Sequence, residues 1–430
     1  MNVQFITLGC KVNKYETDLL KEKCVKAGHV VVDKNEKADM YVINSCSVTN
    51  MSDRKTRQMV SKAKALNKNA IVAVLGCSVE SNKDEKEAFL NADIVLGNED
   101  KMYLFDILES KNISGNNRVT LLKDISAVKR YKKVGVLDKG TDIREQIKIE
   151  DGCNNFCSYC VIPYTRGRVR SRSLEEIKKE AENLSKNNVK EIVVVGIEIA
   201  SYGKDLENTD LFDVLDIFEN TNEIERIRLT SLEPRFLSEE NIKKLSEYNK
   251  LCPHFHISMQ SGNDYVLKRM NRHYTKEYLI QVCENLRKYF QDPYIASDVI
   301  IGFPGETDNE FMDTVNTIKK MGICEIHVFK YSKRNYTKAA KMEGQVKGEI
   351  KKIRSGKLLE LSKKLNENYL NKYIGKTVKV LFENYSEGYL LGYTPNYIKV
   401  KVRGEESLCG MIQDVDLISL EKEIMIGNLK

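Results

Sequence analysis

Three cysteines stand close together in the stretch Asp151-Gly152-Cys153-Asn154-Asn155-Phe156-Cys157-Ser158-Tyr159-Cys160. Their C-x3-C-x2-C spacing lets one loop bind three irons of a 4Fe-4S cube and leaves the fourth iron without a protein ligand. A zinc loop is the alternative, but a zinc site needs four ligands, usually as paired C-x2-C, and no second pair lies downstream. The stretch therefore indicates an iron-sulfur cluster with one iron open for chemistry.

The composition favours a folded chain of several domains. With 430 residues, 41% of them hydrophobic, the chain is long enough for two or three domains. Its eleven cysteines are an odd number, which favours metal ligation or buried thiols over a disulfide framework. The start of the chain has no basic segment or cleavage site, and no run of ~18 apolar residues occurs. We therefore expect a cytoplasmic protein without a membrane partner.

The N-terminal part alternates short apolar runs with helical stretches, which predicts an α/β domain with a parallel sheet. The apolar runs at residues 3–8, 40–44 and 71–75 are each followed by a cysteine, namely Cys10, Cys46 and Cys77. Because the carboxyl ends of parallel strands meet at one edge of a sheet, these thiols are expected to converge there. Three separate buried core residues are the alternative. We favour a second three-cysteine cluster.

Six further strand candidates follow, and all but the last precede a stretch with helical periodicity. They lie at residues 146–150, 192–199, 226–230, 254–259, 296–301 and 325–331. Six βα-type units predict a partial (βα)6 barrel, in which chemistry takes place at the carboxyl ends of the strands. The three-cysteine loop directly follows the first of these strands, as that rule requires.

The C-terminal part changes pattern again. Five strand-length runs separated by turn residues lie at 377–382, 388–393, 397–402, 410–417 and 420–426, which predicts a small β-barrel of a kind that often binds nucleic acid. Tyr385, Tyr389, Tyr393 and Tyr397 recur every four residues, a pattern that fits stacking on bases and equally fits packing in the core or across strands. Between Lys330 and Lys364 twelve basic residues face three acidic ones, which favours a phosphate-rich partner or a solvated helix face.

The spacing of the first cluster, with Tyr159 before its last cysteine, resembles the signature of the radical S-adenosylmethionine (radical SAM) enzymes. With both cysteine sets, a partial barrel and a small C-terminal barrel, nearly the whole chain resembles the methylthiotransferases. Segments that agree are Tyr164-Thr165-Arg166-Gly167-Arg168-Val169-Arg170-Ser171-Arg172, Leu229-Thr230-Ser231-Leu232-Glu233-Pro234 and Met270-Asn271-Arg272-His273-Tyr274-Thr275. The start Leu8-Gly9-Cys10-Lys11-Val12-Asn13 is similar to the branch that acts on threonylcarbamoyladenosine in tRNA.

This resemblance implies three domains: residues 1–130 with an auxiliary cluster, residues 139–367 as the radical SAM core, and residues 368–430 as the barrel called TRAM. It implies two 4Fe-4S clusters, on Cys153, Cys157 and Cys160 and on Cys10, Cys46 and Cys77. One SAM bound at the first cluster would yield a 5'-deoxyadenosyl radical, and a second would methylate sulfur held at the other. The product would be 2-methylthio-N6-threonylcarbamoyladenosine at position 37 of tRNA.

The resemblance also implies partners and cofactor contacts. The partners are the anticodon stem-loop of tRNA, a low-potential electron donor and a sulfur donor. Polar residues at strand ends are the predicted SAM contacts. Glu198 and Gln260 are the preferred candidates, and Asp298 and Glu306 are the next ones. Tyr159 is expected to lie beside the adenine. Arg166, Arg168, Arg170 and Arg172 alternate and would share one face if extended. Arg166 is therefore predicted to clamp the SAM carboxylate or the tRNA backbone.

Two alternatives remain at this level. The substrate could be isopentenyladenosine in tRNA or an aspartate of a ribosomal protein, which are the targets of the other branches. A non-catalytic RNA-binding protein with structural clusters is the alternative from another class.

The chain also departs from the branch pattern after the sixth strand, where Lys330 replaces a proline and Tyr336-Thr337-Lys338 replaces Gly-Thr-Pro. We expect a looser loop there.

Overall fold

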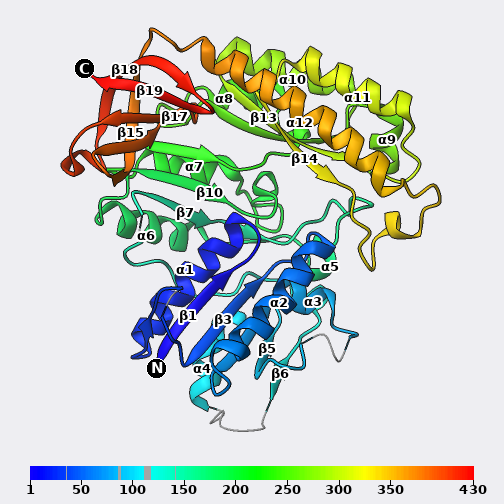
Figure 1. Ribbon diagram of the computed structural model, residues 1–430, viewed down its shortest axis with the longest axis vertical. Coiled ribbons are helices and arrows are strands. Elements are labelled where there is room, and N and C mark those ends of the chain that lie inside the picture. The colour runs from blue at the N-terminus through cyan, green and yellow to red at the C-terminus, as the bar shows by residue number, and fades with distance from the viewer. Residues whose placement is uncertain (35, 86–88, 111–117, 141) are drawn as a thin grey trace.

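The computed structural model describes residues 1–34, 36–85, 89–110, 118–140 and 142–430, and three parts follow one another along the chain (Figure 1). The first is a parallel sheet in the order β2-β1-β3-β4-β5-β6. Its strands are β1 Asn2–Thr7, β2 Val30–Val31, β3 Met40–Ser45, β4 Ile71–Gly76, β5 Ile94–Leu96 and β6 Val119–Leu121. Its helices are α1 Lys11–Lys26, α2 Asn50–Leu66, α3 Cys77–Ser81 and α4 Leu104–Ser110.

The second part holds six parallel strands in two hydrogen-bonded sets, β11-β10-β7 and β12-β13-β14, joined by a bridge between Leu232 and Ile257. The strands are β7 Arg144–Lys148, β10 Glu191–Val195, β11 Arg226–Leu229, β12 His254–Gln260, β13 Tyr294–Ile301 and β14 Glu325–Lys330. The short strands β8 Glu150–Asp151 and β9 Arg170–Ser171 pair with each other. The series therefore runs from β7 to β14 as the predicted partial barrel.

All the helices of the second part except the shortest begin after a Ser, Thr, Asp or Asn whose side chain caps the first turn. The helices are α5 Ile162–Thr165, α6 Leu174–Ser185, α7 Leu211–Glu219, α8 Glu239–Leu245, α9 Asp264–Arg269, α10 Lys276–Tyr289 and α11 Asp308–Met321. In α11, for example, Thr307 and Glu310 form a capping box, and Gly322 ends the helix with φ 58°. Helices α6, α7, α8, α10 and α11 pack on the outside of the strands, whereas the short α5 lies beside α3 of the N-terminal part (Figure 1).

The third part is a closed barrel in the order β15-β16-β17-β19-β18, preceded by the long helix α12 Gly348–Asn371. Its strands are β15 Thr377–Ser386, β16 Tyr389–Tyr393, β17 Lys399–Arg403, β18 Ile412–Glu421 and β19 Ile424–Leu429. The predicted fold class, a parallel-sheet α/β part, a partial barrel and a small β-barrel, is confirmed. Within the described ranges no helix is both long enough and apolar enough to cross a membrane.

Candidate cluster sites and reaction cavity

The loop with Cys153, Cys157 and Cys160 follows β8, and a close backbone contact fixes its first turn. Gly152 has φ 83°, and a Cβ there would lie 1.9 Å from the carbonyl oxygen of Arg168, so only glycine fits. The Cys153 amide donates to the carbonyl of Gly167 at 3.1 Å. Three half-buried free thiols are thus presented from one rigid loop, as three ligands of an iron-sulfur cube require.

The second cysteine set lies at one edge of the N-terminal sheet, because β1, β3 and β4 are neighbours. Cys10 caps α1, Cys46 follows β3, and Cys77 begins α3. The chain turns at Gly9, where φ is 112° and a Cβ would lie 2.7 Å from the Cβ of Cys46. Burial, with smaller contributions from the neighbouring thiols of Cys77 and Cys10, raises the pKa of Cys46 to about 11. The three free thiols follow neighbouring strand ends, and such a donor set fits iron.

Asparagines hold the loops of the second set together. Asn13 Nδ2 donates to the carbonyls of Leu8 and Ser45 at 2.7 and 2.9 Å. Asn44 Nδ2 donates to the carbonyl of Asn13 at 3.0 Å, so both bind backbone. Asn98, which the sequence analysis missed, places its Nδ2 3.5 Å from the sulfur of Cys77.

Arg166 lies between the two cysteine sets and not on a solvent-facing surface. Its side chain is fully buried, with Nε 3.2 Å from the sulfur of Cys77 and Nη1 3.1 Å from both carboxylate oxygens of Asp151. Nη1 and Nη2 also bind Glu16 at 3.0 and 3.1 Å, and Nη2 donates to Asn13 at 2.8 Å. The predicted clamp on the SAM carboxylate or the tRNA backbone is therefore wrong for Arg166, because every arm of its guanidinium is occupied by protein.

A buried ionic network surrounds Arg166. Lys101 Nζ lies 2.5 Å from Glu16, and Lys148 Nζ lies 2.8 Å from Glu16 and 2.6 Å from Asp151. Burial raises the pKa of Glu16, but Arg166, Lys101 and Lys148 together hold it well below its usual range. We name Glu16, Lys101, Lys148, Asp151 and Arg166 the interface network. It joins the N-terminal part to the strand that precedes the Cys153 loop.

The other three arginines of the alternating run do not share a face with Arg166. Arg172 pairs with Glu180 at 2.5 Å, and Arg170 Nη1 donates to the carbonyl of Arg166 at 2.8 Å. Arg168 is exposed, with its guanidinium 4.3 Å above the ring of Phe156. The run turns at Gly167, where φ is 76°, so the extended arrangement that the alternation suggested does not form.

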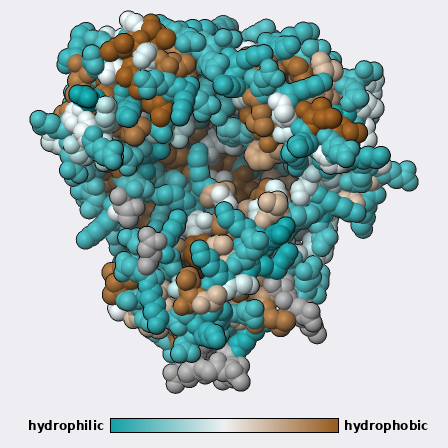
Figure 2. Space-filling view, in the orientation of Figure 1, coloured by the Kyte–Doolittle hydropathy of each residue, from teal (hydrophilic) through white to brown (hydrophobic). Residues whose placement is uncertain are grey.

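A cavity of about 220 Å³ opens beside the first cysteine set. Tyr159, Gln260 and Asp298, three of the predicted SAM contacts, line it together with Cys160. The N-terminal part contributes Val48 and Thr49, and β14 with its following loop contributes Phe329, Lys330, Tyr331 and Ser332. Figure 2 shows a hollow near the centre of this face, between the upper and lower parts of the molecule. We name this space the reaction cavity.

Glu198 lies on the other side of the cluster loop. Its Oε2 accepts from Asn155 Nδ2 at 3.4 Å, and both residues line a separate hollow of about 290 Å³. Burial and the charge of Glu233 raise the pKa of Glu198 to about 7. Its Oε1 is buried without a partner among the described residues, so one oxygen remains for a donor such as an ammonium group.

Glu306 does not face the reaction cavity. Its Oε2 accepts from the Gly302 amide at 2.6 Å and from Arg354 Nη1 at 2.5 Å. The predicted SAM contact of Glu306 is therefore wrong in this geometry, since its carboxylate holds α12 against the turn after β13. Sequence alone could not show this, because Arg354 lies 48 residues further along the chain.

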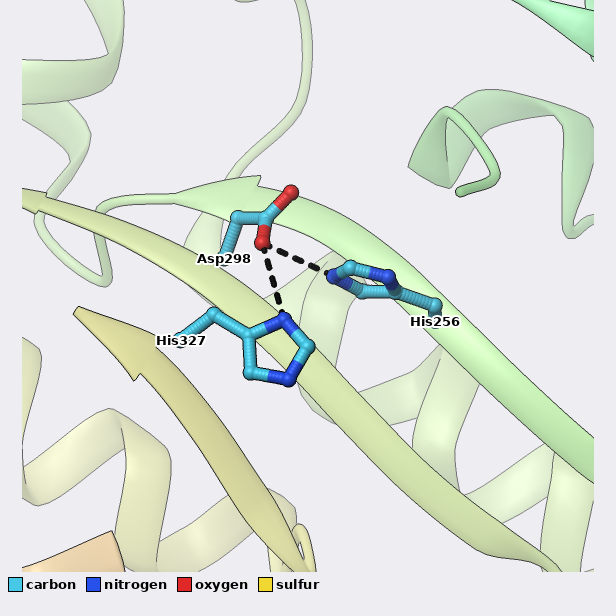
Figure 3. Close-up of side chains that lie close together, drawn as sticks. All are labelled: His256, Asp298 and His327. Atoms are coloured by element: carbon cyan, nitrogen blue, oxygen red, sulfur yellow. Dashed lines mark hydrogen bonds and ion pairs between the residues drawn. The ribbon is translucent and has the colours of Figure 1, made fainter. Parts of the chain in front are cut away.

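Asp298 lies between two histidines on neighbouring strands (Figure 3). His256 Nε2 is 2.9 Å and His327 Nδ1 is 3.4 Å from its Oδ1. Burial raises the pKa of Asp298, but the two histidines lower it to about 2 overall. Asp298 thus faces the reaction cavity as a carboxylate that His256 and His327 already hold in place.

Hydrogen bonds to Asp298 and Glu325 raise the pKa of His327 from 6.5 to about 9. A raised folded-state pKa contributes stability that is fully present below about pH 6.5 and is lost as the pH rises through 9. We expect the stability advantage of the wild type over His327→Gln to shrink between pH 6.5 and 9.5, as measured by urea unfolding at a series of pH values. The exposed His273→Gln is the control. An advantage that does not change with pH would contradict the assignment.

The tyrosines of the C-terminal barrel divide into two groups. Tyr393 and Tyr397 stack with ring centroids 4.7 Å apart, and the guanidinium of Arg144 lies over both rings. These two tyrosines therefore pack the small barrel against the large one. Tyr389 and Tyr385 lie away from that contact, with Lys401 Nζ 4.0 Å above the ring of Tyr389.

The loop after β14 is anchored to the N-terminal part. Arg334 pairs with Asp53 at 2.6 Å and donates to Asn50 Oδ1 at 2.5 Å, and Tyr336 bonds to Asp84. The loss of the prolines was expected to loosen this loop. These contacts instead hold it across the reaction cavity.

The fold and the cysteine loop define a radical SAM enzyme. Residues 147–318 match the family model described as the Radical SAM superfamily, and residues 2–97 match Uncharacterized protein family UPF0004. The solved structure of the radical SAM methyltransferase TsrM from Kitasatospora setae is similar in fold, with a TM-score of 0.58 at 15% identity over 79% of this chain and 75% of that one.

Two relatives are similar over almost the whole length. The chain is 37% identical to the Bacillus subtilis protein named threonylcarbamoyladenosine tRNA methylthiotransferase MtaB, over 97% of this chain and 93% of that protein. It is 34% identical to the Alkaliphilus oremlandii protein named tRNA-2-methylthio-N(6)-dimethylallyladenosine synthase, over 96% and 89%. The chain belongs to the radical SAM methylthiotransferase family, whose members use SAM and two 4Fe-4S clusters.

Proposed function

We propose that this chain converts N6-threonylcarbamoyladenosine at position 37 of tRNA into its 2-methylthio derivative, with one SAM for radical generation and one for methylation of the sulfur. The observation that carries the substrate is the 37% identity, over 97% of the chain, to a relative named for threonylcarbamoyladenosine. The relative named for dimethylallyladenosine is 34% identical. Lys11-Val12-Asn13 beside the first cysteine also favours the former substrate.

In this proposal Cys153, Cys157 and Cys160 hold the cluster that binds SAM, and Cys10, Cys46 and Cys77 hold the second. When bound, the clusters supply the electron that cleaves SAM and the iron that carries the inserted sulfur. The chain's own residues position the reactants. Tyr159, Gln260 and Asp298 line the reaction cavity, and the free oxygen of Glu198 is a candidate acceptor for the SAM ammonium.

The protein also excludes water from the reacting atoms. The reaction cavity lies between the loop after β3 and the loop after β14, and Arg334 holds these two loops together. Phe329 is a large exposed apolar side chain on its wall, which suits the face of a base. The remaining parts of the proposal are the domain limits 1–130, 139–367 and 368–430, the tRNA anticodon stem-loop, a low-potential electron donor, a sulfur donor and a cytoplasmic location.

The test is mass analysis of the nucleosides of total tRNA from cells with and without this gene. We expect the methylthio form of threonylcarbamoyladenosine to disappear in the deletion strain, with accumulation of the unmodified form. If only the methylthio form of isopentenyladenosine disappeared, isopentenyladenosine in tRNA would be the substrate instead. The 34% identity to the relative named for dimethylallyladenosine supports this second candidate. If neither nucleoside changed, a ribosomal protein would become the substrate to examine.

A further inference from the structure

A second large hollow lies on the N-terminal part, away from the reaction cavity. It has a volume of about 900 Å³ and runs along β1 from Gln4 to Leu8. Five lysines and one acid line it: Lys21, Lys34, Lys37, Lys55, Lys62 and Glu36. We name it the lysine groove.

The topology of the sheet creates the lysine groove. β2 pairs only with Asn2 and Val3 of β1, and within the described ranges no strand continues along that edge. From Gln4 onward this edge of β1 therefore has no neighbouring strand among the described residues. It lies between α1, which supplies Lys21, and α2, which supplies Lys55 and Lys62. The loop after β2 supplies Lys34 and Lys37 to the same groove.

The charges in the lysine groove are mostly unpaired. Lys21 pairs with Asp18 at 3.0 Å. For Lys34, Lys37, Lys55 and Lys62 the described residues offer no carboxylate within 4.0 Å, and all four are exposed. A concave surface with this excess of positive charge attracts an extended anion.

Two elements link the lysine groove to the second cysteine set and to the reaction cavity. Its Leu8 end lies two residues before Cys10. On the other wall, Val48 and Thr49 line the reaction cavity, and α2 begins directly after them at Asn50. From there α2 runs for 17 residues, about 25 Å, and carries Lys55 and Lys62 along the groove. Figure 1 shows α2 running away from α5 along the N-terminal sheet.

We propose that the lysine groove binds the phosphate backbone of the RNA strand that leads away from the base in the reaction cavity. This inference rests on the proposed function, because it takes tRNA as the substrate. An acidic protein, such as an electron donor, is the other possible occupant. RNA is favoured because α2, which carries Lys55 and Lys62 along the groove, begins directly after the cavity residues Val48 and Thr49.

The experiment compares two double variants of the cluster-reconstituted full-length enzyme. Lys55→Gln/Lys62→Gln changes the lysine groove, and Lys178→Gln/Lys186→Gln is the matched control on and just after α6, in a hollow that also contains Glu182 and Asp216. The dissociation constant of substrate tRNA is measured by fluorescence anisotropy at several KCl concentrations. Iron content and SAM cleavage without RNA report that the protein is intact.

We expect the groove variant to bind tRNA roughly 10-fold more weakly at low salt. The slope of log K against log salt should fall by about 0.7–0.9 per lost phosphate contact, while the control matches the wild type. If the groove variant binds and modifies tRNA like the control, the proposal that the lysine groove binds RNA is wrong, and the proposed function still stands. If the groove variant binds tRNA as the wild type does but its clusters are reduced more slowly by a protein electron donor, the RNA proposal is also wrong. The lysine groove would then be the binding site of the protein donor. A wild type that neither binds nor modifies tRNA would overturn both proposals.

Discussion

Replacement of Cys10, Cys46 and Cys77 together by alanine is expected to lower the iron of the reconstituted enzyme from about eight to about four per chain. Cleavage of SAM to 5'-deoxyadenosine should continue, and formation of the methylthio nucleoside should fall below detection. The physical reason is that the two cysteine sets lie on different elements. The Cys153 loop is fixed by the close contact at Gly152 and by the hydrogen bond from the Cys153 amide to the carbonyl of Gly167, and none of the three replaced thiols takes part in these contacts.

Iron analysis, the absorbance of the clusters and product analysis by mass spectrometry measure this prediction. The matched control replaces Cys24, Cys283 and Cys324, three buried cysteines outside both sets, by alanine and should keep all of the iron. If the Cys10, Cys46 and Cys77 variant keeps about eight irons, the second cluster has other ligands. The complementary variant without Cys153, Cys157 and Cys160 should lose SAM cleavage entirely.

Much of the fold could be predicted because periodicity and turn residues are local signals. The six strands of the partial barrel and the five of the small barrel lie close to their predicted positions. In the N-terminal sheet β1, β3 and β4 were found, whereas β2, β5 and β6 were missed. Those three strands have only two or three residues each, which is too short for alternation to stand out.

The two cysteine sets could be found because their members share a loop or equivalent strand ends. The residues between the sets could not be found in this way. Glu16 looks like any surface charge on α1, yet its partners Lys101, Lys148 and Arg166 lie 85, 132 and 150 residues away. Buried charges have to be paired, but the sequence does not say with what.

The same limit explains the two corrected SAM contacts. Glu306 was chosen because polar residues near strand ends often bind ligands, and Arg166 because the alternating arginines would share one face of an extended run. In the structure each is satisfied by protein groups, Arg166 by the interface network and Glu306 by Arg354. Gln260 and Asp298, chosen on the same ground as Glu306, do line the reaction cavity. Position along a strand therefore predicts which residues reach the site, and burial among partners decides which remain available.

The second large effect is expected for Arg166→Met, which leaves Glu16 and Asp151 with Lys101, Lys148 and the more distant Arg170, 3.9 Å from Asp151, to balance their charges. Breaking a buried ion pair from one side typically costs about 3–5 kcal/mol. We expect a loss of that size in the free energy of unfolding of the cluster-free protein, measured with urea. Arg168→Met is the matched control, since Arg168 is exposed and should change stability by no more than about 1 kcal/mol.

Arg166→Lys separates charge from geometry. Lysine keeps the positive charge but has one nitrogen, so it cannot reach Glu16, Asp151, Asn13 and the sulfur of Cys77 at once. We expect a smaller loss of stability than in Arg166→Met, together with a shift in the reduction potential of the second cluster, because a donor to the cysteine sulfur is removed. A potential unchanged in Arg166→Lys would restrict Arg166 to a structural role. A stability unchanged in Arg166→Met would mean that Lys101, Lys148 and Arg170 satisfy the two buried carboxylates without Arg166.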